Sequence, residues 1–476
     1  MTSAPPSQPA ALDPGDKAST LGEIDLLIAQ ARRTGDEYYL HRSLGAGSVA
    51  PLPWLAVCRG TPSWYWRGRG EATELAGHGI AFELRIKGES AAESAMAIGQ
   101  DILRRCHLSL EASSPTLPRL LCGFAFDPQA EPDDLWEDFP DAWLVLPRVY
   151  CEHRNGQSQW FVVARVTRES TPEEIDADLR RAREELTGQL GTDWSPREVS
   201  FGGLSDLESA ESWNTRVGEL TRRMDDGVLQ KVVLARRFRL RSPEPPDPWS
   251  VVQRLVDASP GTHVFGVQPR PGVAFVGASP ERLVRMQGRT IETECVAGTI
   301  GRGSDSDSDH SLAQLLLSSR KDNLEHYYVL EDILQALGEL CESMEAGASP
   351  QILKLPTLQH LITKARGRLR EDRTLADVLT RLHPTPAVGG SPRAQALEVI
   401  REMESAPRGW YAGPVGWMGP DTAEFAVAIR SAMITPTGAT VFAGAGIVPG
   451  SEPDKEWRET ENKARAFVSA LQSLRP

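Results

Sequence analysis

The chain has 476 residues and a formal net charge of −13, from 52 Lys and Arg against 65 Asp and Glu. Hydrophobic residues make up 40% and charged residues 25%, which is typical of a globular protein with a large core. The acidic balance argues against a general nucleic-acid-binding protein, which would present a basic face. It leaves open a locally basic pocket for an anionic small molecule.

The N-terminal stretch, residues 1–20, is rich in Pro, Ser and Ala, and we expect a disordered tail there. It lacks the basic start and apolar stretch of a secretory signal, and no later run is long and apolar enough to cross a bilayer. The six cysteines are scattered without a CxxC pair, so neither a zinc site nor a disulfide framework is indicated. We therefore expect a cytoplasmic protein with buried thiols.

The next region, residues 21–200, is predicted to mix helices and strands. Helical spacing of apolar residues is found over 22–33, 93–106 and 171–190. Strands are predicted over 142–153 and 158–166, with Asn155-Gly156 as a hairpin turn between them.

The remaining region, residues 201–476, alternates strands and helices in the same way. Helices are predicted over 205–227, 311–345 and 395–404 and from residue 454 onward, and a loop over 382–392. Strands are predicted over 229–241, 262–269, 272–279, 289–298, 413–418, 424–434 and 439–448. Hairpin-spaced strands mixed with long helices indicate an α+β fold with large antiparallel sheets flanked by helices.

Two segments that superficially resemble ligand loops do not have the required spacing. In 301–311, counting from Asp305, the sixth position is His310 and the twelfth is Leu316, so the Gly and Glu of a calcium loop are absent. We expect a mobile surface loop there. The glycine-rich stretch 443–450 lacks the spacing of a nucleotide loop, and marks a close approach of the backbone to a strand or a ligand.

Acidic residues on two predicted helices are candidates for a cation site. Glu456, Glu459 and Lys463 lie at positions i, i+3 and i+7, so they share one face of the closing helix. Glu325 lies among apolar neighbours, where an unpaired carboxylate would be costly. Both groups are consistent with surface ion pairs. The alternative is a cavity that holds Mg²⁺, which takes one or two protein carboxylates together with oxygens of the substrate.

Three further residues have side chains suited to proton transfer. Lys231 opens an apolar strand, where it either extends its ammonium group to water or has a lowered pKa and acts as a base. Glu281 follows a strand and is either a positioned acid or a turn carboxylate. His383 lies in the Pro/Gly-rich loop 382–392, where a structural histidine is the default interpretation.

Nine segments within residues 205–470 belong together. In chain order they are KVVLARR, SPERL, IETECVAGT, SSRKDNLEHYYV, LQHLITKARGRL, LHPTPAVGG, GWYAGPVGW, EFAVAIRSAMI and AGAGIVPGSEPDKEWRETENK. Together they resemble the chorismate-utilising enzymes, and among these most of all the isochorismate synthases. A fainter similarity to the same family is found at 121–128, LCGFAFDP.

The resemblance implies one large α/β scaffold, with residues 21–200 as its N-terminal half and 201–476 as the chorismate-binding catalytic region. By motif, Lys231 matches the general base, Glu281 the general acid and His383 a histidine near the reacting ring. The Mg²⁺ ligands match Glu325 and Glu459, with Glu456 close by. The positions expected to contact the substrate are Gly298, Thr299, Ala387, Arg430, Gly446 and Lys463.

The expected reaction adds water at C2 of chorismate while the C4 hydroxyl leaves, giving isochorismate. Ala297 and Ala387 stand where amine-adding relatives carry Lys and Thr, and Lys231 is present where ammonia-using relatives usually lack it. Water is therefore the expected nucleophile, without a glutamine amidotransferase subunit. The alternatives are a salicylate synthase, which also eliminates pyruvate, and a catalytically silent chorismate-binding relative. The product could feed menaquinone, siderophore or salicylate synthesis, and a monomer is the default expectation.

Overall fold

The computed structural model describes residues 17–58, 60, 62–70, 73–108, 118–225, 227 and 229–472. Residues 1–16 of the predicted tail lie outside this description, and helix α1 already includes residues 17–20. The helices of the described part are α1 (Lys17–Thr34), α2 (Pro51–Val57), α3 (Ala91–Arg104), α4 (Pro172–Leu190), α5 (Ala210–Asp225), α6 (Pro248–Ala258), α7 (Ser306–Ser318), α8 (Arg320–Leu340), α9 (Leu375–Leu382), α10 (Arg393–Met403) and α11 (Pro453–Leu471).

The described strands form two large sheets, and the predicted α+β class is confirmed. Each list below follows the order of the strands across its sheet. The thirteen-stranded sheet contains β10 (Ser205–Asp206), β11 (Lys231–Arg241), β23 (Gly438–Ile447), β22 (Ser431–Thr435), β13 (Val273–Ser279), β12 (His263–Arg270), β2 (Ser63–Arg67), β3 (Thr73–His78), β8 (Val149–Arg154), β9 (Gln157–Val166), β1 (Tyr38–Gly47) and β5 (Cys106–Leu108), with β19 (Gly390–Ser391) paired to β11. The ten-stranded sheet contains β16 (Cys341–Ala346), β18 (Leu358–Leu369), β15 (Thr290–Gly301), β14 (Arg282–Gln287), β21 (Thr422–Val427), β20 (Pro414–Met418), β6 (Leu120–Phe124), β7 (Ala142–Leu146) and β4 (Phe82–Ile86), with β17 (Gln351–Lys354) paired to β18.

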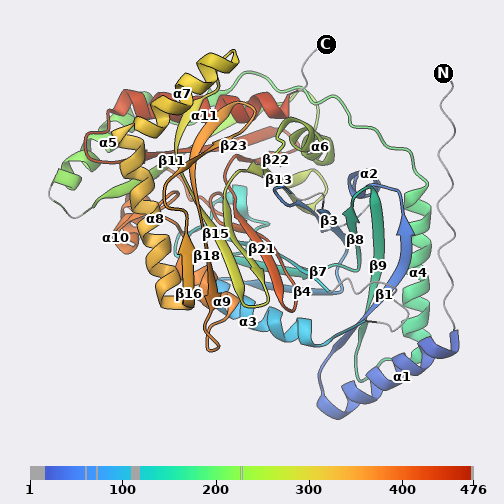
Figure 1. Cartoon of the computed structure of the whole chain (residues 1–476). Coiled ribbons are helices and arrows are strands. Elements are labelled where there is room, and N and C mark those ends of the chain that lie inside the picture. The colour runs from blue at the N-terminus through green and yellow to red at the C-terminus, as the bar shows by residue number, and fades with distance from the viewer. Residues whose placement is uncertain are drawn as a thin grey trace.

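Both halves of the chain contribute strands to both sheets. Strands β1 to β9 come from the first 166 residues, and they extend each sheet at the end away from β11 and β15. Within the described pairs, β1 with β5 is parallel and the other pairs are antiparallel. Figure 1 shows α1 and α4 beside β1 and β9, far from α7, α8 and α11, which lie beside the C-terminal strands.

The main core lies between the two sheets and is rich in aromatic side chains. Trp64, Trp143 and Trp410 pack edge-on or tilted, with ring centroids 5.2 to 6.2 Å apart. Each of these three indoles is buried. A second core lies between the thirteen-stranded sheet and its covering helices, among them α1, α4 and α6. Burial of this apolar surface on both faces fixes the sheet that carries the site.

Two segments that were each predicted as one strand form two strands in the structure. In both segments the break lies where the chain passes from one sheet to the other. Residues 142–153 form β7 in the ten-stranded sheet and β8 in the thirteen-stranded sheet. Residues 424–434 likewise divide into β21 and β22, with Arg430 at a φ of 51° between them. The hairpin at Asn155-Gly156 is confirmed, with positive φ at both residues as its turn type requires.

The long helix predicted over 311–345 is also wrong. The chain instead forms α7, α8 and then strand β16, and Ser319 separates the two helices. The Ser319 hydroxyl accepts a hydrogen bond from the backbone N–H of Asp322 and so caps α8.

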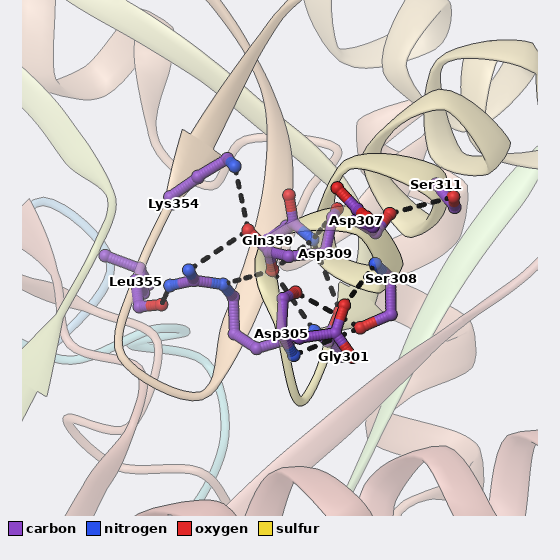
Figure 2. A network of polar contacts seen from close by, with 11 residues as sticks. Gly301, Asp305, Asp307, Ser308, Asp309, Ser311, Lys354, Leu355 and Gln359 are labelled. Atoms are coloured by element: carbon purple, nitrogen blue, oxygen red, sulfur yellow. Dashed lines mark hydrogen bonds and ion pairs between the residues drawn. The ribbon is translucent and has the colours of Figure 1, made fainter.

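The mobile loop predicted over 301–311 is an ordered helix start. Asp305 caps α7, and the Asp309 carboxylate pairs with Arg302 at 2.6 Å and with Lys354 at 2.8 Å. The side-chain amide of Gln359 donates to the same carboxylate at 3.1 Å. Figure 2 shows Lys354 of β17 and Gln359 of β18 beside Asp309 of α7.

No helix in the described part of the chain is long and apolar enough to cross a membrane.

Candidate active site

A polar cavity lies where the ends of β11, β15 and β23 meet helices α8 and α11. Eight of the predicted site residues line it: Glu281, Gly298, Thr299, Glu325, Ala387, Arg430, Glu459 and Lys463. They come from six separate segments between residues 281 and 463, so the fold gathers groups that are far apart in the chain.

Lys231 reaches this cavity through an ion pair with one of its lining residues. The side chain is fully buried, and Nζ lies 2.9 Å from Oε1 of Glu325. Gly446 makes the pair possible, because a Cβ at that position would lie 2.8 Å from Oε1 of Glu325 and 3.1 Å from Cε of Lys231. The predicted close approach of the glycine-rich stretch is therefore a contact with these two side chains.

Glu281 is buried where β13 ends and β14 begins, and its backbone is held firmly. Its N–H donates to Oγ of Ser279, and its carbonyl accepts from the N–H of Val427 at 3.1 Å. Burial raises the pKa of the carboxyl to about 7, against the opposing effects of the Thr385 hydroxyl and the Lys231 charge. A carboxyl with this pKa is partly protonated near neutral pH and can act as a proton donor.

Two glutamates of α11, Glu456 and Glu459, are each paired with a lysine. Glu459 lies 2.7 Å from Nζ of Lys463, and the buried Glu456 lies 2.8 Å from Nζ of Lys321. Burial raises the pKa of Glu456, whereas the cations around Glu459 outweigh its burial and lower its pKa. The second oxygen of Glu456, Oε2, is buried without a hydrogen-bond partner among the described residues.

The oxygen atoms of these carboxylates decide whether the site can bind a divalent cation. Among the described residues, no three His, Cys, Asp or Glu side chains already form a metal-binding group. Mg²⁺ needs only one or two protein carboxylates and takes its other ligands from water and substrate. Glu325, Glu456 and Glu459 supply hard oxygen donors around Lys321, whose charge acts on all three, and the unpaired Oε2 of Glu456 is a free donor. The residues present therefore fit Mg²⁺.

The cavity also contains cationic side chains that are suited to an anion. Arg430 lines the cavity, and burial lowers the pKa of its guanidinium to about 10, so it stays charged near neutral pH. Its Nη1 donates to the carbonyl of Lys463, whose own Nζ donates to the carbonyl of Gly444 at 2.9 Å. An arginine beside a lysine is a typical binding site for a carboxylate.

Residues that the sequence analysis did not single out also line the cavity. Oγ1 of Thr299 and Nδ1 of His360 are 2.9 Å apart, and Nε2 of His360 has no partner among the described groups. Tyr411, Lys321 and Asp322 belong to the same wall. The pairing of Thr299 with His360 across β15 and β18 would have identified this histidine, but that register is not readable from the chain.

Besides Lys231, three predicted site residues do not line the cavity: Gly446, Glu456 and His383. Gly446 and Glu456 contact the groups already described. His383 instead packs its ring against Phe126 at 5.8 Å, with Nε2 3.3 Å from the Phe126 carbonyl. Burial lowers the pKa of His383 to about 3, so the ring is neutral. The structure does not bring this histidine to the cavity.

The chain is similar to known proteins in both sequence and fold. The family described as chorismate binding enzyme matches residues 26–472. A salicylate biosynthesis isochorismate synthase of Pseudomonas aeruginosa is 35% identical over 95% of this chain and 94% of its own length. The isochorismate synthase MenF of Bacillus subtilis is 35% identical over 74% of each chain. The solved structure of the menaquinone-specific isochorismate synthase MenF of Escherichia coli has a TM-score of 0.77, with 26% identity over 95% of this chain and all of that one.

Proposed function

We propose that this chain, which belongs to the family of chorismate-binding enzymes, converts chorismate into isochorismate. The proposal rests on the presence of both Lys231 and Glu281 at this cavity. One cavity combines a buried lysine with a buried carboxyl whose pKa is about 7, beside cationic side chains. The reaction needs one group that takes a proton from water and another that gives a proton to the leaving oxygen.

Glu281 acts as the general acid in this proposal. It donates its proton to the C4 oxygen as the C–O bond breaks, and that hydroxyl leaves as water. Its burial raises its pKa to about 7, so a large fraction of the carboxyl is protonated near neutral pH. The hydrogen bonds to its backbone fix its position, so the proton is held at one point in the cavity.

Lys231 acts as the general base and removes a proton from the water that attacks C2. Only a neutral amine can do this, so Nζ must first lose a proton and give up its ion pair with Glu325.

The substrate is a dianion, and two parts of the cavity are suited to its charges. Arg430 and Lys463 bind anionic groups on one wall. Mg²⁺, held by Glu325 and Glu459 with Glu456, would supply the positive charge for the C1 carboxylate. Gly298 has a φ of 80° and its backbone lies against Asp322. Beside it, Thr299 offers a hydroxyl group to the substrate.

The test is the product that the purified protein makes from chorismate with Mg²⁺, separated by chromatography. We expect isochorismate, and no product when a chelator replaces Mg²⁺. Salicylate formed without an added lyase would replace the proposal with a salicylate synthase. Unchanged chorismate, with tight binding by calorimetry, would indicate a silent binding protein.

A further inference from the structure

A buried group of charged side chains lies directly behind Glu281, and the proposed reaction does not use it. The group comprises Arg69, Arg282, Glu294 and Glu424, called here the acid-support cluster. The side chains of Glu294 and Glu424 are only 2% and 4% exposed. Four buried charges at one place are costly to bury unless each is paired, so their arrangement requires an explanation.

Glu294 connects to the chain on both sides of Glu281. Its carboxylate pairs with Arg69, and Nη1 of Arg69 donates to the carbonyl of Pro280 at 2.6 Å. The same carboxylate lies 3.2 Å from Nη1 of Arg282. Pro280 and Arg282 are the two sequence neighbours of Glu281, so one buried carboxylate ties down both.

Within these four side chains, two arginines are paired with two glutamates. Nη2 of Arg282 also lies 3.2 Å from Oε1 of Glu424, which gives two cations and two anions. His263 adds no charge, because its Nδ1 accepts the backbone N–H of Arg69 and burial lowers its pKa far below the usual value. Removal of one carboxylate would therefore leave an excess positive charge behind Glu281.

We propose that Glu294 is a positioning residue, which holds the Pro280–Arg282 segment through the two arginines and places a negative charge behind the Glu281 carboxyl. The proposal rests on the proposed role of Glu281 as the general acid. Through these contacts the cluster both orients the acid and keeps it protonated at the pH of the reaction.

The other groups near Glu281 act in different directions. Lys231 from β11 and the Thr385 hydroxyl, 3.3 Å from Oε1, stabilise its ionised form. The negative charge of Glu294 on β15 opposes ionisation. Cys295 and Tyr411 also interact with Glu281, and burial raises the pKa of both, so neither is charged near neutral pH.

The test is the pH profile of kcat/KM with chorismate and Mg²⁺ in purified wild type and variants. In Glu294→Gln, the alkaline limb should move down by about one pH unit, because the excess positive charge favours the ionised acid. In Arg69→Met, Glu294 has one cation fewer and the ionised form of Glu281 is less favoured. The alkaline limb should therefore move to higher pH. Glu424→Gln removes the same charge from the far side of Arg282, and should move the limb less than Glu294→Gln.

Arg69→Lys separates orientation from charge. It keeps the cation but loses the fork that reaches both Glu294 and Pro280, so we expect about tenfold lower kcat and an unmoved limb. A limb that stays in place in both Glu294→Gln and Arg69→Met, or that moves the same way in both, would overturn the proposal. If Glu294→Gln fails to fold, as judged by circular dichroism, the two Arg69 variants still decide. Failure of the proposed function itself would appear earlier, as a wild type that makes no isochorismate.

Discussion

The two ends of the cavity are built differently. At the Glu281 end, the neighbouring charges are buried and paired, and a sheet holds them in place. At the α8–α11 end, the α11 carboxylates Glu456 and Glu459 are paired with Lys321 and Lys463, whose side chains are 47% and 21% exposed. One oxygen of Glu456 has no described partner. We infer that the first end is set before substrate arrives, whereas the second rearranges when a cation and the substrate bind.

The largest expected effect is loss of the two proton-transfer groups. Lys231→Ala or Glu281→Ala should lower kcat by about 10³-fold, because a positioned acid or base contributes on that scale. The measurement is turnover of chorismate by the folded variants. Near wild-type turnover in either variant would remove that residue from the mechanism.

The Glu281 end should also make stability depend on pH. The pKa of Glu281 is raised from 4.5 to about 7, so its burial costs nothing below pH 4.5 and stability falls as pH rises through about 7. The full loss is about 3 kcal/mol. In Glu281→Gln this loss should disappear, so urea unfolding at pH 8 should show the inactive variant to be more stable than wild type, with little difference at pH 5. Equal pH dependence in both proteins would contradict the raised pKa.

At the rearranging end, the expected effect is on the cation. Glu456→Gln or Glu459→Gln should raise the Mg²⁺ concentration needed for half-maximal activity by about 10- to 100-fold. Glu452→Gln is the matched control, because Glu452 lies just before α11 and pairs with Lys455 on an exposed surface. If the control changes the Mg²⁺ requirement as much as the test variants do, the assignment of these carboxylates is wrong.

The smallest expected effect lies outside both ends, at the helix start shown in Figure 2. Asp309→Asn weakens the pairing with Arg302 and Lys354, and should lower the melting temperature by about 2 °C. The pH profile and the Mg²⁺ requirement should not change. A change in either would mean that this network is coupled to the cavity.

The positions of most candidate site residues could be predicted from the sequence, but less of the architecture could be. Motif resemblance located Lys231, Glu281, Glu325 and Arg430, which the structure places in or against one cavity. The breaks between β7 and β8 and between β21 and β22 were missed, because a strand buried on both faces stays apolar when the chain changes sheet.

The cluster behind Glu281 could not be predicted for a related reason. Arg69 and Glu294 are 225 positions apart in the chain, and no local pattern links them. Only the packing of the N-terminal strands beside β12 and β13 brings Arg69 to the carbonyl of Pro280. His383 shows the reverse case, since its motif predicts a role near the substrate while its ring packs on Phe126.

The central claim is that Lys231 activates water for attack at C2 while Glu281 releases the C4 hydroxyl. Its most direct test is the conversion of unlabelled chorismate in ¹⁸O-labelled water, with the product analysed by mass spectrometry and fragmentation. The account predicts isochorismate with one ¹⁸O, located on the C2 hydroxyl. Unlabelled isochorismate would show that the hydroxyl migrates within the substrate, and would contradict it.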